Sequence, residues 1–248
     1  MAGHSKFKNI MHRKGAQDKK RAKLFSKLSR EITVAAKMGG IDPDANPRLR
    51  LAISAAKAES MPKDNIQRAI EKTASDKNAA DFEEVRYEGY GPAGIALIVE
   101  GLTDNRNRTA SELRSCFAKG GGNMQDAGSV AYQFDRIGQI VYPLEVESED
   151  AMFEFALEAG AENILSEGDE HVVHTAMVDL NNVAQALQDR YGDAQATGLI
   201  WHAKVMTTLT LDQAQSLLNL IDALEDNDDV QHVFTNADIP DDVLEQLS

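Results

Sequence analysis

The residues best suited to chemistry in this chain are cations gathered at its start. Residues 1–30 contain ten Lys or Arg and a single acid, Asp18. Such a concentration of like charge favours a polyanionic partner, because phosphates relieve the repulsion between the cations. The ordinary alternative is a solvated helix face, which leaves the shortage of acidic neighbours unexplained. Histidines and a phenyl ring accompany the cations and can contact or stack on bases. The predicted nucleic-acid-binding residues are His4, Lys6, Phe7, Lys8, His12, Arg13, Lys14, Lys19, Lys20, Arg21, Lys23, Lys27 and Arg30.

A second group of candidate anion-binding residues lies between a predicted strand and a predicted helix, in the segment 104–109. Its two arginines are among only eight basic residues in positions 78–248. Guanidinium groups beside the N–H groups of a helix start suit a phosphate. A capped turn whose arginines pair with local carboxylates explains the same residues equally well. The residues of this predicted second site are Asn105, Arg106, Arg108 and Thr109.

The chain shows no pattern typical of an enzyme, a metal site or a cofactor site. Residues 89–94 match G-x-G-x-x-G, but a proline interrupts them and a strand follows, so we expect a hairpin turn. His171 and His174 fall on opposite faces of a predicted strand. Cys116 is expected in the core, and the acids at 225–229 in a solvated loop. We predict no catalytic residues, no metal and no cofactor. A hydrolase or transferase that uses the second anion site is a minor alternative.

Charge divides the chain into two parts. Residues 1–77 hold 18 Lys or Arg and 8 Asp or Glu, whereas residues 78–248 hold 8 and 32, which gives the net charge of −14. The basic part can bind nucleic acid while the acidic part is repelled from it and stays available to protein partners. No apolar run is long enough to cross a membrane, and the start lacks a secretory signal. With one cysteine, these features predict a cytoplasmic protein; a mitochondrial transit peptide is the alternative for the basic start.

Three short amphipathic helices are predicted after a basic arm of residues 1–16. Apolar residues recur every three or four positions from 17 to 38, and two glycines end this helix. Asn46 and Pro47 are typical of the cap and first turn of a second helix, which reaches about residue 58. A third helix begins near Pro62. None of these helices buries its apolar stripe alone, so we expect them to pack together.

Strands and helices alternate in the rest of the chain. Between residues 139 and 207 their predicted order is strand, helix, strand, strand, helix, strand, which is the order of a ferredoxin-like unit. The elements on either side, including a strand predicted at 130–135, suggest a second unit of the same kind, interrupted by the first. We therefore predict an α+β fold: an N-terminal three-helix domain followed by two ferredoxin-like α+β domains, one inserted in the other. The expected domains are 1–78, 79–136 with 204–248, and 137–203.

Several stretches of this sequence resemble the YebC/PmpR family. The resemblance covers essentially the whole chain, and the combination of motifs is highly specific. It implies a helical N-terminal domain and two α+β domains. At Phe7 the family usually has Trp, so the aromatic ring is kept but the indole donor is lost. The stretches are MAGHSK at 1–6, HRK at 12–14, GGIDPDANPRLR at 39–50, YEGYGPAG at 87–94, LTDNRNRT at 102–109, GSVAYQF at 128–134, ALEAGAE at 156–162 and DALEDNDDVQ at 222–231.

The resemblance also implies a function. Family members are described as cytoplasmic transcriptional regulators that bind DNA, and mitochondrial and some bacterial members as factors that promote translation on the ribosome. Carried over to this chain, the binding residues are those of the MAGHSK arm and the basic helix. We expect a non-enzymatic, cytoplasmic, DNA-binding transcriptional regulator; the alternative is a translational activator that binds ribosomal RNA. The lack of a clear helix pair with a tight turn and a polar recognition face favours the alternative. No membrane partner is expected.

Overall fold

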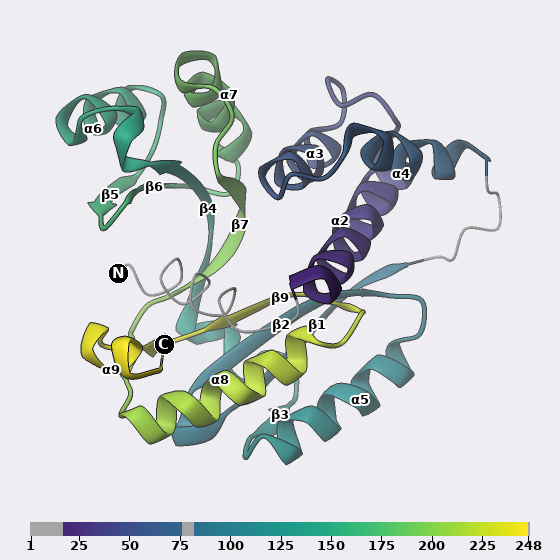
Figure 1. The fold of residues 1–248 in the computed structure, drawn as a ribbon, viewed down its shortest axis with the longest axis vertical. Coiled ribbons are helices and arrows are strands. Elements are labelled where there is room, and N and C mark those ends of the chain that lie inside the picture. The colour runs from purple at the N-terminus through teal and green to yellow at the C-terminus, as the bar shows by residue number, and fades with distance from the viewer. Residues whose placement is uncertain (1–16, 76–81, 248) are drawn as a thin grey trace. The chain divides into compact units, whose positions relative to one another are not determined.

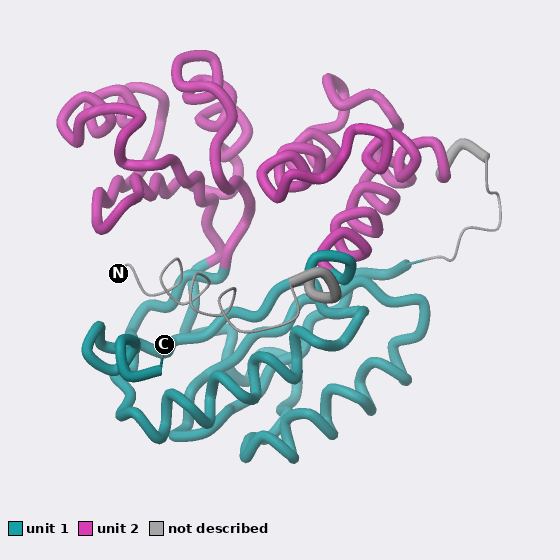
Figure 2. Tube along the Cα trace, viewed as in Figure 1, with its two compact units in different colours: residues 1–23, 80–135, 201–248 teal, residues 24–79, 136–200 magenta. Residues whose placement is uncertain are grey.

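The computed structural model describes residues 17–75 and 82–247, with side chains described from 21 to 72 and from 82 to 247. Two compact units make up the chain (Figure 2): residues 1–23, 80–135 and 201–248 form unit 1, and residues 24–79 and 136–200 form unit 2. Within the described ranges, no helix combines the length and the apolar character needed to cross a membrane. The three-domain division expected from the sequence stays a prediction.

The three predicted N-terminal helices are confirmed. Helix α3 begins after Asn46, whose side-chain oxygen accepts a hydrogen bond from the N–H of Leu49 at 3.1 Å. Its end is a tight turn in which Ser60 adopts a φ of 58°, and four residues join it to the next helix. The helices in Figure 1 are α2 Gln17–Gly39, α3 Pro47–Ala58 and α4 Lys63–Ser75.

These helices share one apolar core in unit 2. Asn46 ties two of them together, because its amide nitrogen donates to the carbonyls of Ala35 and Gly40 at 2.8 Å each while its oxygen caps α3. The end of α2 and the start of α3 are thus satisfied by one buried side chain. The buried apolar residues of this core are Ile32, Ala35, Ala36, Leu49, Ala52, Ala56, Met61, Ile66 and Ala69.

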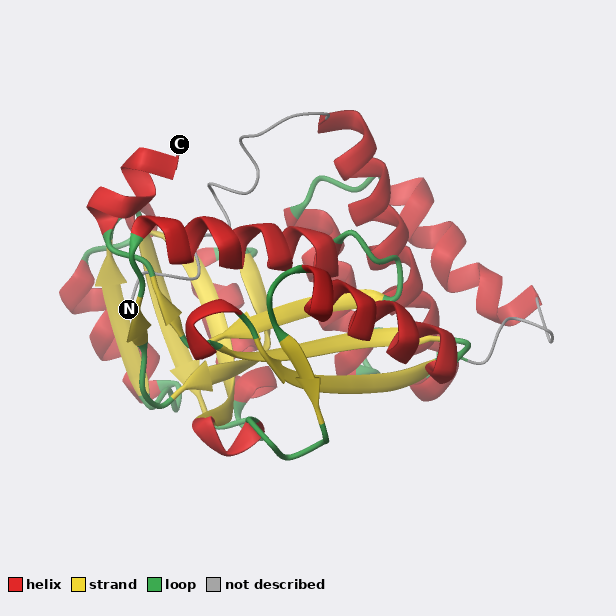
Figure 3. Cartoon of the chain, turned by 90° about the horizontal axis from the view of Figure 1, so that it is seen from below, coloured by secondary structure: helices red, strands yellow, loops and turns green. Residues whose placement is uncertain are grey.

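Unit 1 contains a four-stranded antiparallel sheet in the order β3-β1-β2-β9. Helices α5 and α8 lie across its strands (Figures 1 and 3), and residues such as Phe117 and Leu217 form one core with Leu97 and Val99 of the sheet. A short parallel pair, β8 and β10, and helix α9 complete the unit. The bounds are β1 Glu83–Tyr90, β2 Ala96–Thr103, α5 Arg106–Lys119, β3 Asn123–Gln125, β8 Thr207–Thr208, α8 Leu211–Glu225, β9 Val230–Thr235, β10 Ala237–Asp238 and α9 Asp241–Leu247.

A second four-stranded sheet, in the order β5-β6-β4-β7, belongs mainly to unit 2. Its strands appear along the chain as β4, β5, β6 and β7, so their order in space is second, third, first, fourth, which is ferredoxin-like. Ile140, Met152, Val173 and Leu187 contribute to its core. The bounds are β4 Phe134–Pro143, α6 Glu149–Glu158, β5 Asn163–Glu167, β6 Glu170–Thr175, α7 Leu180–Tyr191 and β7 Ala196–Ala203.

Both sheets have the same arrangement, and the ferredoxin-like prediction is confirmed. In the sheet of unit 1, the positions of the first, second, third and fourth ferredoxin-like strands are occupied by β2, β3, β1 and β9. The strand in the third position, β1, therefore comes first along the chain. The strand predicted at 130–135 is wrong: a 3₁₀ turn occupies Ala131–Gln133, and β4 begins at Phe134. The short strand β3 is instead the edge strand of the sheet in unit 1, next to β1.

Candidate nucleic-acid interface

Helix α2 separates its apolar and basic residues onto opposite sides. Phe25, Leu28 and Ile32 face the core that α2 shares with α3 and α4. At about 100° per residue, most of the predicted binding positions on α2 fall on the other side of the helix. Arg21 is the exception, since it follows the apolar side and is exposed. We call the opposite set the basic stripe: Lys19, Lys20, Lys23, Lys27 and Arg30.

Part of the predicted interface lies outside the described residues. This applies to the whole arm, with His4, Lys6, Phe7, Lys8, His12, Arg13 and Lys14, and to the side chains of Lys19 and Lys20. The side chains of Lys23, Lys27 and Arg30 are half-buried along α2.

Lys23, the first residue of the basic stripe whose side chain the structure describes, has acidic partners within unit 1. The Nζ of Lys23 lies 2.5 Å from a carboxylate oxygen of Asp226 and 3.9 Å from one of Asp228, in the connection between α8 and β9. Both carboxylates are largely exposed, so water screens these ion pairs. These ion pairs therefore contribute little to stability, and Lys23 also donates to the backbone carbonyl of Asp226.

The predicted second anion site has the geometry of a capped turn. Asn105 accepts from the N–H of Arg108 at 3.1 Å and begins α5. The guanidinium of Arg108 bonds to Asp104 at 2.8 Å and to Asp229 at 3.0 Å, while that of Arg106 is 3.7 Å from Glu83. These contacts are those of the alternative stated for this segment, in which the arginines pair with local carboxylates. Anion binding at this turn stays a prediction.

Asp229 organises this turn from the far end of the chain. Its Oδ2 accepts hydrogen bonds from the hydroxyls of Thr103 at 3.1 Å and Thr109 at 2.7 Å, in addition to the Arg108 bond. Thr109 is fully buried and its hydroxyl is used inside the protein. Asp229 itself is only 5% exposed, so the expectation of a solvated loop at 225–229 is wrong for this residue. The sequence held no signal for it, since its neighbours in the chain are solvated acids of the same type.

Glu88 is a second buried carboxylate that sequence reasoning missed. It is fully buried and accepts the N–H groups of Gly128, Val130 and Ala131 at 2.9 Å each. Burial alone would raise the pKa of Glu88, but these three donors and Arg86, at 3.3 Å, hold it below its ordinary value. Glu88 thus fixes the segment before β4 and has a structural role.

The residues whose types could serve catalysis or metal binding are held in structural contacts. His171 is fully buried; its Nδ1 is 2.7 Å from Ser166 Oγ, and its Nε2 is near two backbone carbonyls. Cys116 packs against the core of unit 1, as predicted, and burial raises the pKa of its thiol. Residues 89–94 form the predicted hairpin connection between β1 and β2. In the described ranges, no cluster of three or more His, Cys, Asp or Glu is arranged to hold a metal.

Comparison with known proteins shows to which family this chain belongs. The model of the TACO1/YebC protein N-terminal domain matches residues 5–76, and that of the TACO1/YebC second and third domain matches residues 82–237. The chain belongs to the TACO1/YebC family. The model for 82–237 is named for transcriptional regulation, which agrees with a regulatory role. The crystal structure of a conserved hypothetical protein, Aq1575, from Aquifex aeolicus is similar at 43% identity and a TM-score of 0.83, covering 94% of this chain and 96% of that one.

Proposed function

We propose that this TACO1/YebC family member is a cytoplasmic regulator that binds nucleic acid and acts by binding rather than by catalysis. The basic arm and the basic stripe of α2 contact the phosphate backbone. The acidic α+β parts are repelled by it, which confines contact to the N-terminal part and leaves the acidic surfaces to protein partners. Control of transcription through duplex DNA is the function proposed first.

The observation that carries this proposal is the two-sided character of α2. Its apolar side is anchored in the helical core, so the basic stripe is held on a rigid element. From Lys19 to Arg30 the stripe extends about 17 Å, a length over which a DNA duplex presents about ten phosphate charges. Five cations at this spacing can neutralise several phosphates without reading any base, which makes backbone binding the best supported activity.

A second candidate function is binding to ribosomal RNA in translation. Helix α4, which a four-residue turn joins to α3, has several outward polar groups that bond to one another within the helix. Arg68 bonds to Asn65 at 3.0 Å and Gln67 bonds to Glu71 at 2.8 Å. A recognition helix needs such groups for base edges in the major groove. This feature favours backbone contacts, which a folded RNA surface offers as well as a duplex does.

The experiment is a salt titration of affinity with the full chain, on a DNA duplex and on ribosomes. With four to six phosphate contacts, the slope of log affinity against log salt should be roughly −4 to −5 on the duplex. The variant Lys20→Gln with Lys27→Gln should bind about tenfold more weakly, with a slope reduced by about 1 to 2. The control, Lys57→Gln with Lys63→Gln, removes the same charge from exposed positions on α3 and α4.

The two polymers are compared in the same titration. A larger loss on ribosomes than on the duplex supports the translation role, and the reverse supports transcription. Equal losses for the stripe variant and its control would show that the basic stripe is not the interface.

A further inference from the structure

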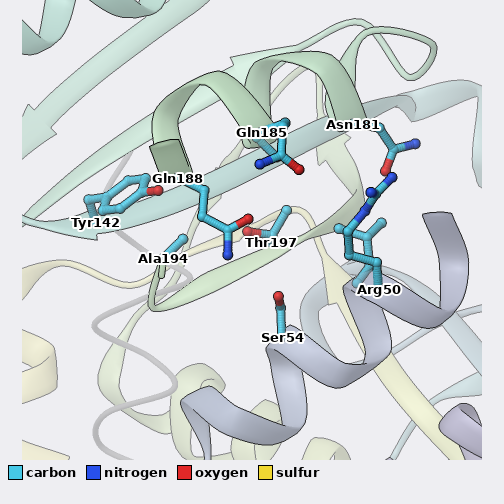
Figure 4. A pocket seen from close by; sticks show the side chains of 10 residues that line it. Arg50, Ser54, Tyr142, Asn181, Gln185, Gln188, Ala194 and Thr197 are labelled. Atoms are coloured by element: carbon cyan, nitrogen blue, oxygen red, sulfur yellow. The ribbon is translucent and has the colours of Figure 1, made fainter. Parts of the chain in front are cut away.

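A recess in unit 2 gathers polar side chains from the helical segment and from the inserted α+β segment. Helix α3 reaches it, since Leu51 also packs against the apolar core formed around β4, β6 and α7. In Figure 4 the side chains of Arg50 and Ser54, one turn apart on α3, face residues of α7 and β7. The lining consists of Arg50, Leu51, Ser54, Tyr142, Asn181, Ala184, Gln185, Gln188, Ala194 and Thr197.

Arg50 is the unusual member of this set. Its side chain is half-buried, and among the residues that the structure describes it has no hydrogen-bond or ion-pair partner. Arg48, two positions earlier, pairs with both carboxylate oxygens of Glu31, at 2.8 and 3.3 Å. An incoming anion would give this cation the partner that the described residues do not supply.

The side of α7 that faces Arg50 is neutral although this part of the chain is acidic. Residues 136–200 hold 13 Asp or Glu and only 2 Lys or Arg, yet the recess contains amides and hydroxyls and no carboxylate. Asn181, Gln185 and Gln188 follow one another at helical spacing on α7. Gln185 and Gln188 donate their amide N–H groups to Asp189 and Asp193. This fixes their orientation and leaves the amide of Asn181 as a donor for a ligand.

The remaining hydroxyls complete the donor set. Ser54 and Thr197 line the recess from the α3 and β7 sides. Burial raises the pKa of Tyr142 to about 12, and its hydroxyl donates to the Gly192 carbonyl at 2.9 Å. Tyr142 therefore stays neutral and adds no negative charge that would repel an anion.

The size of the recess is compatible with a phosphate group. The space that the centres of water-sized groups can occupy in the recess is about 30 Å³, within about 380 Å³ of empty space that opens to solvent. This space has room for about two water-sized groups. Oxygens of one phosphate group fit this space, and the donors that line it suit an anion of this kind.

We propose that this recess binds a single phosphate group of a nucleic-acid backbone, held by the Arg50 guanidinium and by donors from Ser54, Asn181 and Thr197. The proposal rests on the proposed function, to which it adds a phosphate contact separate from the basic stripe of α2. A contact that draws on α3, α7 and β7 at once also gives the inserted segment a part in binding, although that segment is acidic overall.

Two matched pairs of variants of the full chain test this site. Arg50→Ala removes the unpaired cation, and Lys57→Ala removes an exposed cation from the same helix. Asn181→Asp places a permanent carboxylate opposite Arg50, and Asn182→Asp places the same charge at the adjacent exposed position of α7. The probes are inorganic phosphate, followed by the NMR signals of the Arg50 Nε–H and the Asn181 amide, a 20-base-pair DNA duplex and a 20-nucleotide single-stranded RNA.

Phosphate is expected to shift both signals to saturation in the natural chain and in the two control variants, and not to shift the remaining signal in Arg50→Ala or Asn181→Asp. These two variants should also bind the nucleic acids about fivefold to tenfold more weakly than their controls. Equal affinities within each pair would overturn the proposal. If phosphate shifts the signals but nucleic-acid affinity is unchanged, the site serves a small phosphorylated ligand and the backbone assignment is wrong. If the natural chain binds neither polymer, the proposed function itself fails.

Discussion

At the scale of single residues, buried carboxylates hold the segments around the α+β core in place. Asp229 joins Thr103, Thr109 and Arg108 into one network, and Gly101 is required beside it, because a Cβ there would lie 2.5 Å from the Asp229 carbonyl oxygen. These acids have structural roles, unlike the exposed acids that make up most of the negative charge.

The lowered pKa of Glu88 predicts how the stability of the protein depends on pH. Its pKa in the folded protein lies below the ordinary value of 4.5, so its ionised form stabilises the fold above that pH, and this contribution is lost as the pH falls through the folded pKa. Glu88→Gln should lower stability by about 2 kcal/mol at pH 7, because charge-assisted hydrogen bonds are lost. It should also weaken the dependence of stability on pH below about 4.5.

Thermal unfolding from pH 7 to pH 3 measures both effects. The control is Glu154→Gln, at an exposed position of α6, which should change stability by less than about 0.5 kcal/mol. A pH profile of Glu88→Gln parallel to that of the natural chain would contradict the argument.

At the scale of elements, one side chain links α2 to α3. Asn46 caps α3 with its oxygen and satisfies two carbonyls at the end of α2 with its nitrogen. The helical segment that carries the basic stripe therefore depends on a residue in the loop between two helices.

Substitution at Asn46 separates these two roles. Asn46→Ala should cost about 2 kcal/mol, because the cap and the hydrogen bond to the buried carbonyl of Ala35 are lost. Asn46→Ser keeps an uncharged side-chain acceptor for the cap and removes the amide donors, so it should recover about 1 kcal/mol of this loss. Urea denaturation compares the two variants. Equal destabilisation would show that the cap contributes nothing measurable.

At the scale of the whole molecule, charge is distributed so that one region attracts polyanions and the rest repels them. Residues 1–77 carry a net charge of +10 and residues 78–248 one of −24. Long-range repulsion from the acidic part weakens non-specific binding, and salt screens this repulsion together with the attraction of the basic part.

Deletion of residues 1–16 tests how the basic charge is shared between the arm and α2. The deleted segment holds four Lys or Arg. If about two of them contact phosphates, the slope of log affinity against log salt on duplex DNA should fall in magnitude by about 2. Filter binding between low and moderate salt measures it. An unchanged slope would assign all phosphate contacts to the rest of the chain.

The sequence by itself determined the features that depend on neighbouring residues. The helical period of α2, the cap at Asn46 and the division of charge are local patterns, and the order of elements from β4 to β7 predicted a ferredoxin-like sheet.

Only the tertiary structure decided which chemically similar residues play different roles. Glu88 and Asp229 are buried while most other acids are solvated, and the short β3, rather than residues 130–135, takes the edge of its sheet. Arg50 and residues of α7 line one recess although they lie far apart in the chain. Such contacts depend on how distant segments pack, and packing free energy overrides local propensity, so no local pattern in the sequence contains them.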